Sequence, residues 1–188
     1  MADNYLEKKM EEHRRGALSR TNVRRMPLSG EQPGTVRMKI DTLRVIVTDG
    51  AGDYAPAIIG RLRGAGCRVA FRSDDEKGGR ALAQKSGARF YPASFAGCVA
   101  DDLTKVWGGI DVVIVTDGVI PDGVETGTLK RIISVGTAPE LSIAESCDTA
   151  TVNGIDVSGF TPADVAQLCL MICLTDSSCI NGMIFRSL

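Results

Sequence analysis

Histidine and closely paired cysteines are scarce in this sequence, and together these scarcities argue against a zinc site. The 188 residues contain one histidine, His13, and one tryptophan. The six cysteines include no Cys-x-x-Cys pair, so histidine and cysteine offer no zinc-ligand set. No apolar run approaches the roughly 20 residues that a membrane-spanning helix needs. The first residues are charged, unlike a secretory signal, so we expect a cytoplasmic protein that binds neither a metal nor a membrane.

Charge is nearly balanced over the whole chain but unevenly distributed along it. Residues 1–40 contain nine Lys and Arg against five Asp and Glu, whereas residues 41–188 contain thirteen against eighteen. The basic residues near the start alternate with Glu7, Glu11 and Glu12, and this mixture predicts no nucleic-acid binding. Helix formers at 4–15 and the Pro and Gly residues at 16–34 predict a short helix followed by an extended arm. We therefore divide the chain into this N-terminal segment, 1–40, and one domain, 41–188.

Short apolar runs alternate with helical patterns from Leu43 onward. The patterns predict helices at 55–64, 76–86 and 99–107, and a last helix at 161–174 with Thr161 as its N-cap. Strands are predicted at 43–47, 67–71, 88–92, 110–115, 129–135, 152–157 and 183–185. Strands that alternate with helices imply a parallel sheet covered on both faces. The expected fold is α/β, a Rossmann-like doubly wound parallel sheet in three layers.

Four segments carry a resemblance to a known family. They read VIVTDGAGDYAPAIIGRLRGAGCRVAF, DDEKGGRALAQKSGARFYPASF, WGGIDVVIVTDGV and TPADVAQLCLMICLTDSSCINGMIF. Over Leu43 to Phe185 the chain resembles the short-chain dehydrogenases/reductases, whose members use NAD(P) for hydride transfer. The resemblance implies a shortened C-terminal half, because too few residues join the fourth, fifth and sixth strands to form the family's long helices.

The family's glycine loop is altered where it would meet the cofactor. In that family, glycines let the backbone approach a pyrophosphate held at a helix N-terminus. Thr48 matches the family pattern, but Asp49, Asp53 and Ala55 replace its three glycines. Gly50 and Gly52 remain, yet two carboxylates in the loop would repel a pyrophosphate.

The other positions of the family's nucleotide site are altered as well. After the second strand, Ser73 stands where the family has an acid for the ribose and Asp74 where it has an arginine for a 2′-phosphate. We expect no cofactor, NAD(P) being the one that the resemblance would imply. The positions that match the family's site are Thr48, Asp49, Gly50, Gly52, Asp53, Arg72, Ser73, Asp74, Ser94, Thr116, Asp117 and Gly118.

Catalytic residues of the family are missing from the domain. The family uses Ser-Tyr-x-x-x-Lys, in which the tyrosine donates a proton. No Tyr-x-x-x-Lys occurs within residues 41–188, no lysine follows Lys130, and Thr137 stands at the position of the serine. Asp49, Asp53 and Asp117 are expected at one edge of the sheet, where they form a magnesium site or, in the interpretation that we favour, solvated turns.

Two functions follow from this pattern. The first is a non-catalytic protein that forms a homo-oligomer, or a hetero-oligomer with a longer relative, through Thr161 to Leu174 and Met183 to Phe185. The family pairs this helix with its twin, and the expected apolar face is Val165, Leu168, Cys169 and Ile172. The alternative is an oxidoreductase that binds NAD(P) or another nucleotide at an atypical site.

Overall fold

The computed structural model describes residues 43–125, 128–139, 141–142, 150–175 and 180–187. The helix and arm predicted for residues 1–40 lie outside the described residues. Within the described part of the chain, no helix has the length and apolar character needed to cross a membrane.

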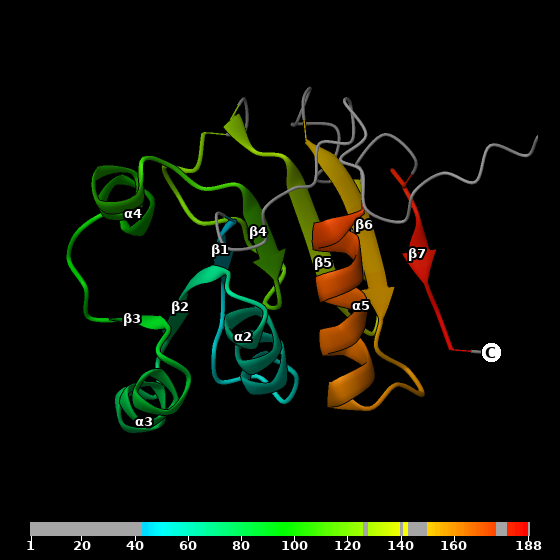
Figure 1. Cartoon of the computed structure of the whole chain (residues 1–188), viewed down its shortest axis with the longest axis horizontal. Helices are drawn as coiled ribbons and strands as arrows, with labels where there is room; N and C mark the ends of the chain where they lie inside the picture. Colours follow the sequence, from blue (N-terminus) through cyan, green and yellow to red (C-terminus); the bar gives the residue numbers. More distant parts are fainter. Residues whose placement is uncertain (1–42, 126–127, 140, 143–149, 176–179, 188) are drawn as a thin grey trace, which may run out of the picture. The chain divides into compact units, whose positions relative to one another are not determined.

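A seven-stranded, entirely parallel sheet forms the centre of the domain (Figure 1). Its strand order is β3-β2-β1-β4-β5-β6-β7, which reverses direction between β1 and β4. Ligands bind in open α/β sheets at such a reversal, beyond the carboxyl ends of the strands. The strands are β1 (Arg44–Val47), β2 (Arg68–Ser73), β3 (Arg89–Pro92), β4 (Val112–Val115), β5 (Arg131–Gly136), β6 (Thr151–Asp156) and β7 (Ile184–Phe185).

Four described helices connect these strands: α2 (Ala55–Gly64), α3 (Glu76–Ser86), α4 (Val99–Trp107) and α5 (Pro162–Leu174). Their ends follow local chemistry. The Asp75 side chain accepts a hydrogen bond from the Gly78 N–H at the start of α3, and a left-handed Gly87 ends that helix. At α5, Thr161 and Asp164 form a reciprocal capping box. The predicted bounds of all four helices are confirmed.

Helices cover both faces of the sheet, which confirms the three-layer α/β architecture. On one face, α2 and α5 bury Ile58, Leu62 and Ile172 against alternate residues of the central strands. On the other face, α4 buries Leu103 against Ile46 and its neighbours. Figure 1 shows α3, α2 and α5 side by side over the sheet, with α4 apart from them.

The connections on either side of β5 are short, as the sequence indicates. Residues 116–130 join β4 to β5, and residues 137–150 join β5 to β6. Among the described residues of these two connections there is no α-helix. The C-terminal half of the domain therefore has its strands and final helix, but its described connections lack long helices.

A buried ion cluster ties together the amino ends of β1, β4 and β5. The Asp111 side chain is 3% exposed and lies 2.7 Å from Arg44 Nε and 2.8 Å from Lys130 Nζ. It also accepts a hydrogen bond from the Arg44 backbone N–H at 3.0 Å. The hydrogen bonds from Arg44 and Lys130 outweigh burial and lower the pKa of Asp111 to about 2.

Candidate functional site

Hydrogen bonds among four residues join the carboxyl ends of β1 and β4. The Thr48 hydroxyl donates to Asp117 Oδ1 at 2.5 Å and accepts from the Thr116 N–H at 3.0 Å. The Thr116 hydroxyl accepts from the Asp49 N–H and donates to the Asp49 carbonyl, both at 3.1 Å. At the point where the strand order reverses, these polar groups are therefore engaged in hydrogen bonds with one another.

Several backbone N–H groups of the β1–α2 turn are already used in hydrogen bonds within the protein. The N–H groups of Asp49, Gly50 and Ala51 donate to Thr116, Arg72 and Asp49 respectively. In the first turn of α2, the Ala55 N–H donates to the Gly52 carbonyl, and Pro56 has no N–H.

Gly50 is required by packing in this turn. A Cβ at Gly50 would lie 2.2 Å from the Phe71 ring, so the backbone of the turn passes directly over β2. The glycine that the chain retains here has a steric role that does not depend on any ligand.

The end of β2 departs from the sequence prediction, which placed residues 72–74 beyond the strand. The strand continues to Ser73, because it pairs with β3 as far as Pro92. Ser73 is buried and its hydroxyl accepts from the Asp75 N–H, so Ser73 is withdrawn from any ligand at this edge. The Ser94 hydroxyl donates to Glu76 at 2.9 Å.

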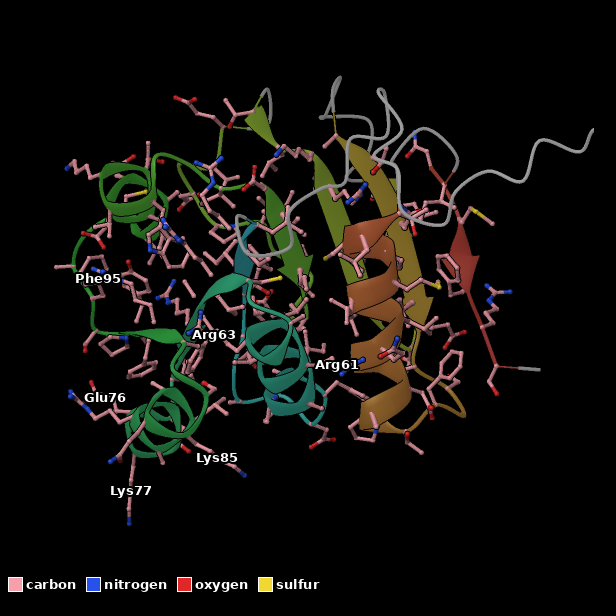
Figure 2. The ribbon with its side chains drawn as sticks, viewed as in Figure 1. Arg61, Arg63, Glu76, Lys77, Lys85 and Phe95 are labelled. Atoms are coloured by element: carbon pink, nitrogen blue, oxygen red, sulfur yellow. The ribbon has the colours of Figure 1, made fainter. Side chains whose placement is uncertain are left out.

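A cavity of about 350 Å³ lies beside the β1–β4 junction. Thr48, Arg72 and Asp117 are the residues from the sequence-based list that line it. Asp49, Thr116, Ser94 and Gly118 belong to the same edge but do not line the cavity. The remaining walls come from Ile46, the segment 95–99, and Val119, Pro121 and Asp122. Figure 2 labels Phe95 beside the connection from β3 to α4.

Sequence reasoning missed these remaining walls. Phe95 is the last residue of one of the four resembling segments, whereas Cys98 and Asp122 lie outside all four. The Cys98 thiol donates to the Asp122 carbonyl at 3.2 Å. The order of strands and helices could have indicated these walls, because the segments that follow β3 and β4 must pass the carboxyl edge of the sheet.

Thr137, the residue at the position of the family's serine, follows β5 and is exposed. No tyrosine is described beyond β3, and Lys130 lies at the opposite edge, paired with Asp111. A Tyr-x-x-x-Lys spacing does occur at Tyr5 and Lys9, but both residues precede β1 and lie outside the described residues. Within the described part of the chain, no tyrosine and lysine of the family's catalytic type lie beside Thr137.

The groups whose pKa values are strongly shifted do not line this cavity, although the ring of one of them, Tyr91, lies 5.1 Å from that of Phe95 in its wall. Burial raises the pKa of the Cys173 thiol to about 12, and it also raises that of Cys169 in α5. Burial and a hydrogen bond to Asp102 raise the pKa of Tyr91 to about 12. Among the described residues, no group of three or more acidic, cysteine or histidine side chains is arranged to hold a metal ion, and this includes Asp49, Asp53 and Asp117.

Solved structures with the same fold are numerous. BdcA (YjgI) from E. coli is 17% identical with a TM-score of 0.55, over 76% of this chain and 95% of that chain. A glucose/ribitol dehydrogenase-type short-chain dehydrogenase/reductase from Brucella melitensis is 15% identical with a TM-score of 0.58, over 77% and 94%. A short-chain dehydrogenase from Burkholderia cenocepacia, solved with NADP, is 17% identical with a TM-score of 0.55, over 78% and 96%. The chain has the fold of the short-chain dehydrogenases/reductases.

No family model matches the sequence, and no curated protein matches it. The likeness thus comes from three-dimensional structure, and it shows the fold alone.

Proposed function

We propose that this protein is a non-catalytic relative of the short-chain dehydrogenases that acts by binding another protein chain. The partner is a second copy of this chain or a longer relative with the same fold. Its cytoplasmic location, expected from the sequence, remains a prediction.

The state of the β1–α2 turn carries the proposal. Three successive N–H groups of this turn, at Asp49, Gly50 and Ala51, already donate to protein acceptors. Pro56 also removes one N–H from the first turn of α2, where a pyrophosphate would be held. Asp49 and Asp53 add negative charge beside the same position. Repulsion between a carboxylate and a phosphate at 4 Å costs on the order of 1 kcal/mol or more outside bulk water.

Exposed apolar residues at the other end of the sheet support the binding role. Large hydrophobic side chains with more than a third of their surface exposed include Met171 and Leu174 on α5 and Met183 and Ile184 at β7. The strand β7 is paired only with β6, so its outer edge is open within the described residues. Apolar residues that gather beside an open strand edge are typical of a surface that a partner covers.

The apolar face expected for α5 differs from the exposed one, because most of its expected residues are buried. Val165, Cys169 and Ile172 have no exposed surface, because they pack in the core, and Leu168 is half-buried. The side of α5 that can reach a partner therefore contains Met171 and Leu174.

Two measurements test the proposal. Calorimetric titration with NAD(H) and NADP(H) should give no binding tighter than about 100 μM. Light scattering should give a mass above the 20.0 kDa of one chain. Turnover of aldehydes, ketones or alcohols with either cofactor would contradict the non-catalytic role, and a monomer at micromolar concentration would exclude the homo-oligomer.

The second candidate is a nucleotide-binding protein, and the cavity at the carboxyl edge favours it. The cavity has the volume of a small ligand, and Arg72 supplies a positive charge to its wall. One structural neighbour was solved with NADP. Binding that disappears in Arg72→Gln would favour this candidate over the first.

A further inference from the structure

A second hollow, of about 340 Å³, lies at the opposite edge of the sheet, among the amino ends of β2 and β3. It is separate from the carboxyl edge discussed above, and its volume falls in the range of small-molecule sites. The hollow is lined by Arg63, Arg68, Val69, Gly87, Ala88, Arg89 and Trp107.

Three arginines supply the charge of this hollow. Arg63 comes from the last turn of α2, whereas Arg68 and Arg89 are the first residues of β2 and β3. The lining residues include no acidic side chain. The C-termini of α2, α3 and α4 lie at this edge, and each contributes about half a negative charge. Arg89 is paired with the carboxylate of Asp102, so Arg63 and Arg68 supply the positive charge that no described carboxylate neutralises.

Protein contacts hold two of the three guanidinium groups in place. Arg63 donates to the Cys67 carbonyl at 2.7 Å and to the Ser86 carbonyl at 3.4 Å, and it extends from α2 between β2 and α3 (Figure 2). Gly87 has φ +72°, and a Cβ there would lie 3.2 Å from Arg63 Nη2, so the glycine allows this approach. Arg89 is held 2.7 Å from Asp102.

Arg68 differs from its two neighbours. Its side chain has no hydrogen bond or ion pair to the described residues, although it lies beside two other positive groups. Like charges brought together in this way favour an anion between them. The lining also includes the half-buried side chain of Trp107, the one aromatic residue of the hollow.

We propose that this hollow binds a small organic phosphate. Its phosphate would be held by Arg63, Arg68 and Arg89, because guanidinium groups match phosphate oxygens in charge and geometry. The organic part would pack on Trp107. The proposal goes beyond the function proposed above and does not depend on it.

Trp107 is the only tryptophan in the chain, so its fluorescence reports directly on this hollow. We would titrate the full-length protein with AMP at low salt and use adenosine as the uncharged control. AMP should change the fluorescence saturably with a Kd below about 1 mM, adenosine should not, and inorganic phosphate should compete with AMP.

Arg68→Gln is the decisive variant, since no described contact of the fold depends on this side chain. Loss of one charged hydrogen bond should weaken AMP binding about tenfold. Two control variants remove the same charge elsewhere. Arg80→Gln alters an exposed residue that pairs with Glu76, and Arg72→Gln alters the cavity at the carboxyl edge. Both should leave the Kd within about twofold of the unmodified protein.

Three results would overturn the proposal: no saturable change in fluorescence, equal binding of AMP and adenosine, or an unchanged Kd in Arg68→Gln. NADP(H) also carries phosphates, so the same two variants show at which of the two sites any dinucleotide binds. A signal lost only in Arg72→Gln belongs to the carboxyl edge and contradicts the proposed function, whereas one lost only in Arg68→Gln belongs to this hollow.

Discussion

The hydroxyl of Thr48 donates a hydrogen bond to the carboxylate of Asp117 at 2.5 Å, across the ends of two adjacent strands. In the resembled family, the corresponding threonine belongs to the glycine loop, and the position of Asp117 belongs to a motif beside the cofactor. Here the side chains at these two positions form a hydrogen bond with each other, and Thr116 extends the hydrogen-bond network to Asp49. The edge thus gains internal hydrogen bonds where the resemblance implies contacts to a nucleotide.

Replacement of Thr48 by valine tests the energy of this network. Thr48→Val keeps the shape of the side chain but leaves the Thr116 N–H without its acceptor, and Asp117 Oδ1 then accepts only from the Val119 N–H. We expect the free energy of unfolding to fall by about 1–2 kcal/mol, measured by urea denaturation. Thr104→Val on the exposed side of α4 is the matched control and should change it by less than about 0.5 kcal/mol. Equal effects of the two substitutions would show that the network adds nothing specific.

Much of the fold could be predicted from the sequence because its signals are local. The helix α5 shows why: Thr161, Pro162 and Asp164 mark its start, and each acts within one turn of the chain. The apolar runs of β1 and β4 likewise identify strands that are buried on both faces.

The ion cluster at the amino edge could not be predicted in the same way. Asp111 and Arg44 are 67 residues apart, and only the pairing of β1 with β4 brings them together. The burial of Ser73 has a similar origin, since it depends on how far β2 pairs with β3. The three arginines of the second hollow come from α2, β2 and β3, and each alone resembles an ordinary surface residue in the sequence.

Acid stability should depend on Asp111. Its folded pKa of about 2 lies below the ordinary value of 3.8, so the charged form stabilises the fold. This contribution, of about 2 kcal/mol, is complete above pH 4 or so and is lost as the pH falls from about 4 to 2.

Denaturation of Asp111→Asn across that pH range provides the measurement. The variant should be less stable than the unmodified protein at pH 7, and the difference should shrink below pH 4 or so. Asp74→Asn, at an exposed position, should leave the curve unchanged. A constant difference from pH 7 to pH 2 would assign the loss to packing instead of charge.

The buried Arg131 should stabilise the end of α5. This helix has no basic residue in its last turn, but Arg131 of β5 donates to the carbonyls of Cys173 and Thr175. These carbonyls belong to the set that a helix C-terminus leaves without partners. We expect Arg131→Met to lower the free energy of unfolding by about 2 kcal/mol or more. Hydrogen exchange should show α5 losing protection first, and uniform loss over the domain would contradict a local role.

Oligomerisation through α5 should depend on Met171. The side chain is 41% exposed on a helix whose other side packs in the core, and the exposed Leu174 follows it by three residues. In a two-fold contact the same residue appears twice, so Met171→Glu would place two carboxylates in one apolar interface. We expect light scattering of this variant to give the mass of a single chain, with an unchanged circular dichroism spectrum. Val106→Glu introduces the same change at a residue of α4 that is 51% exposed, and it should leave the oligomer intact. An oligomer that persists in Met171→Glu would move the interface away from α5, and one that dissociates in both variants would point to a general effect of added charge.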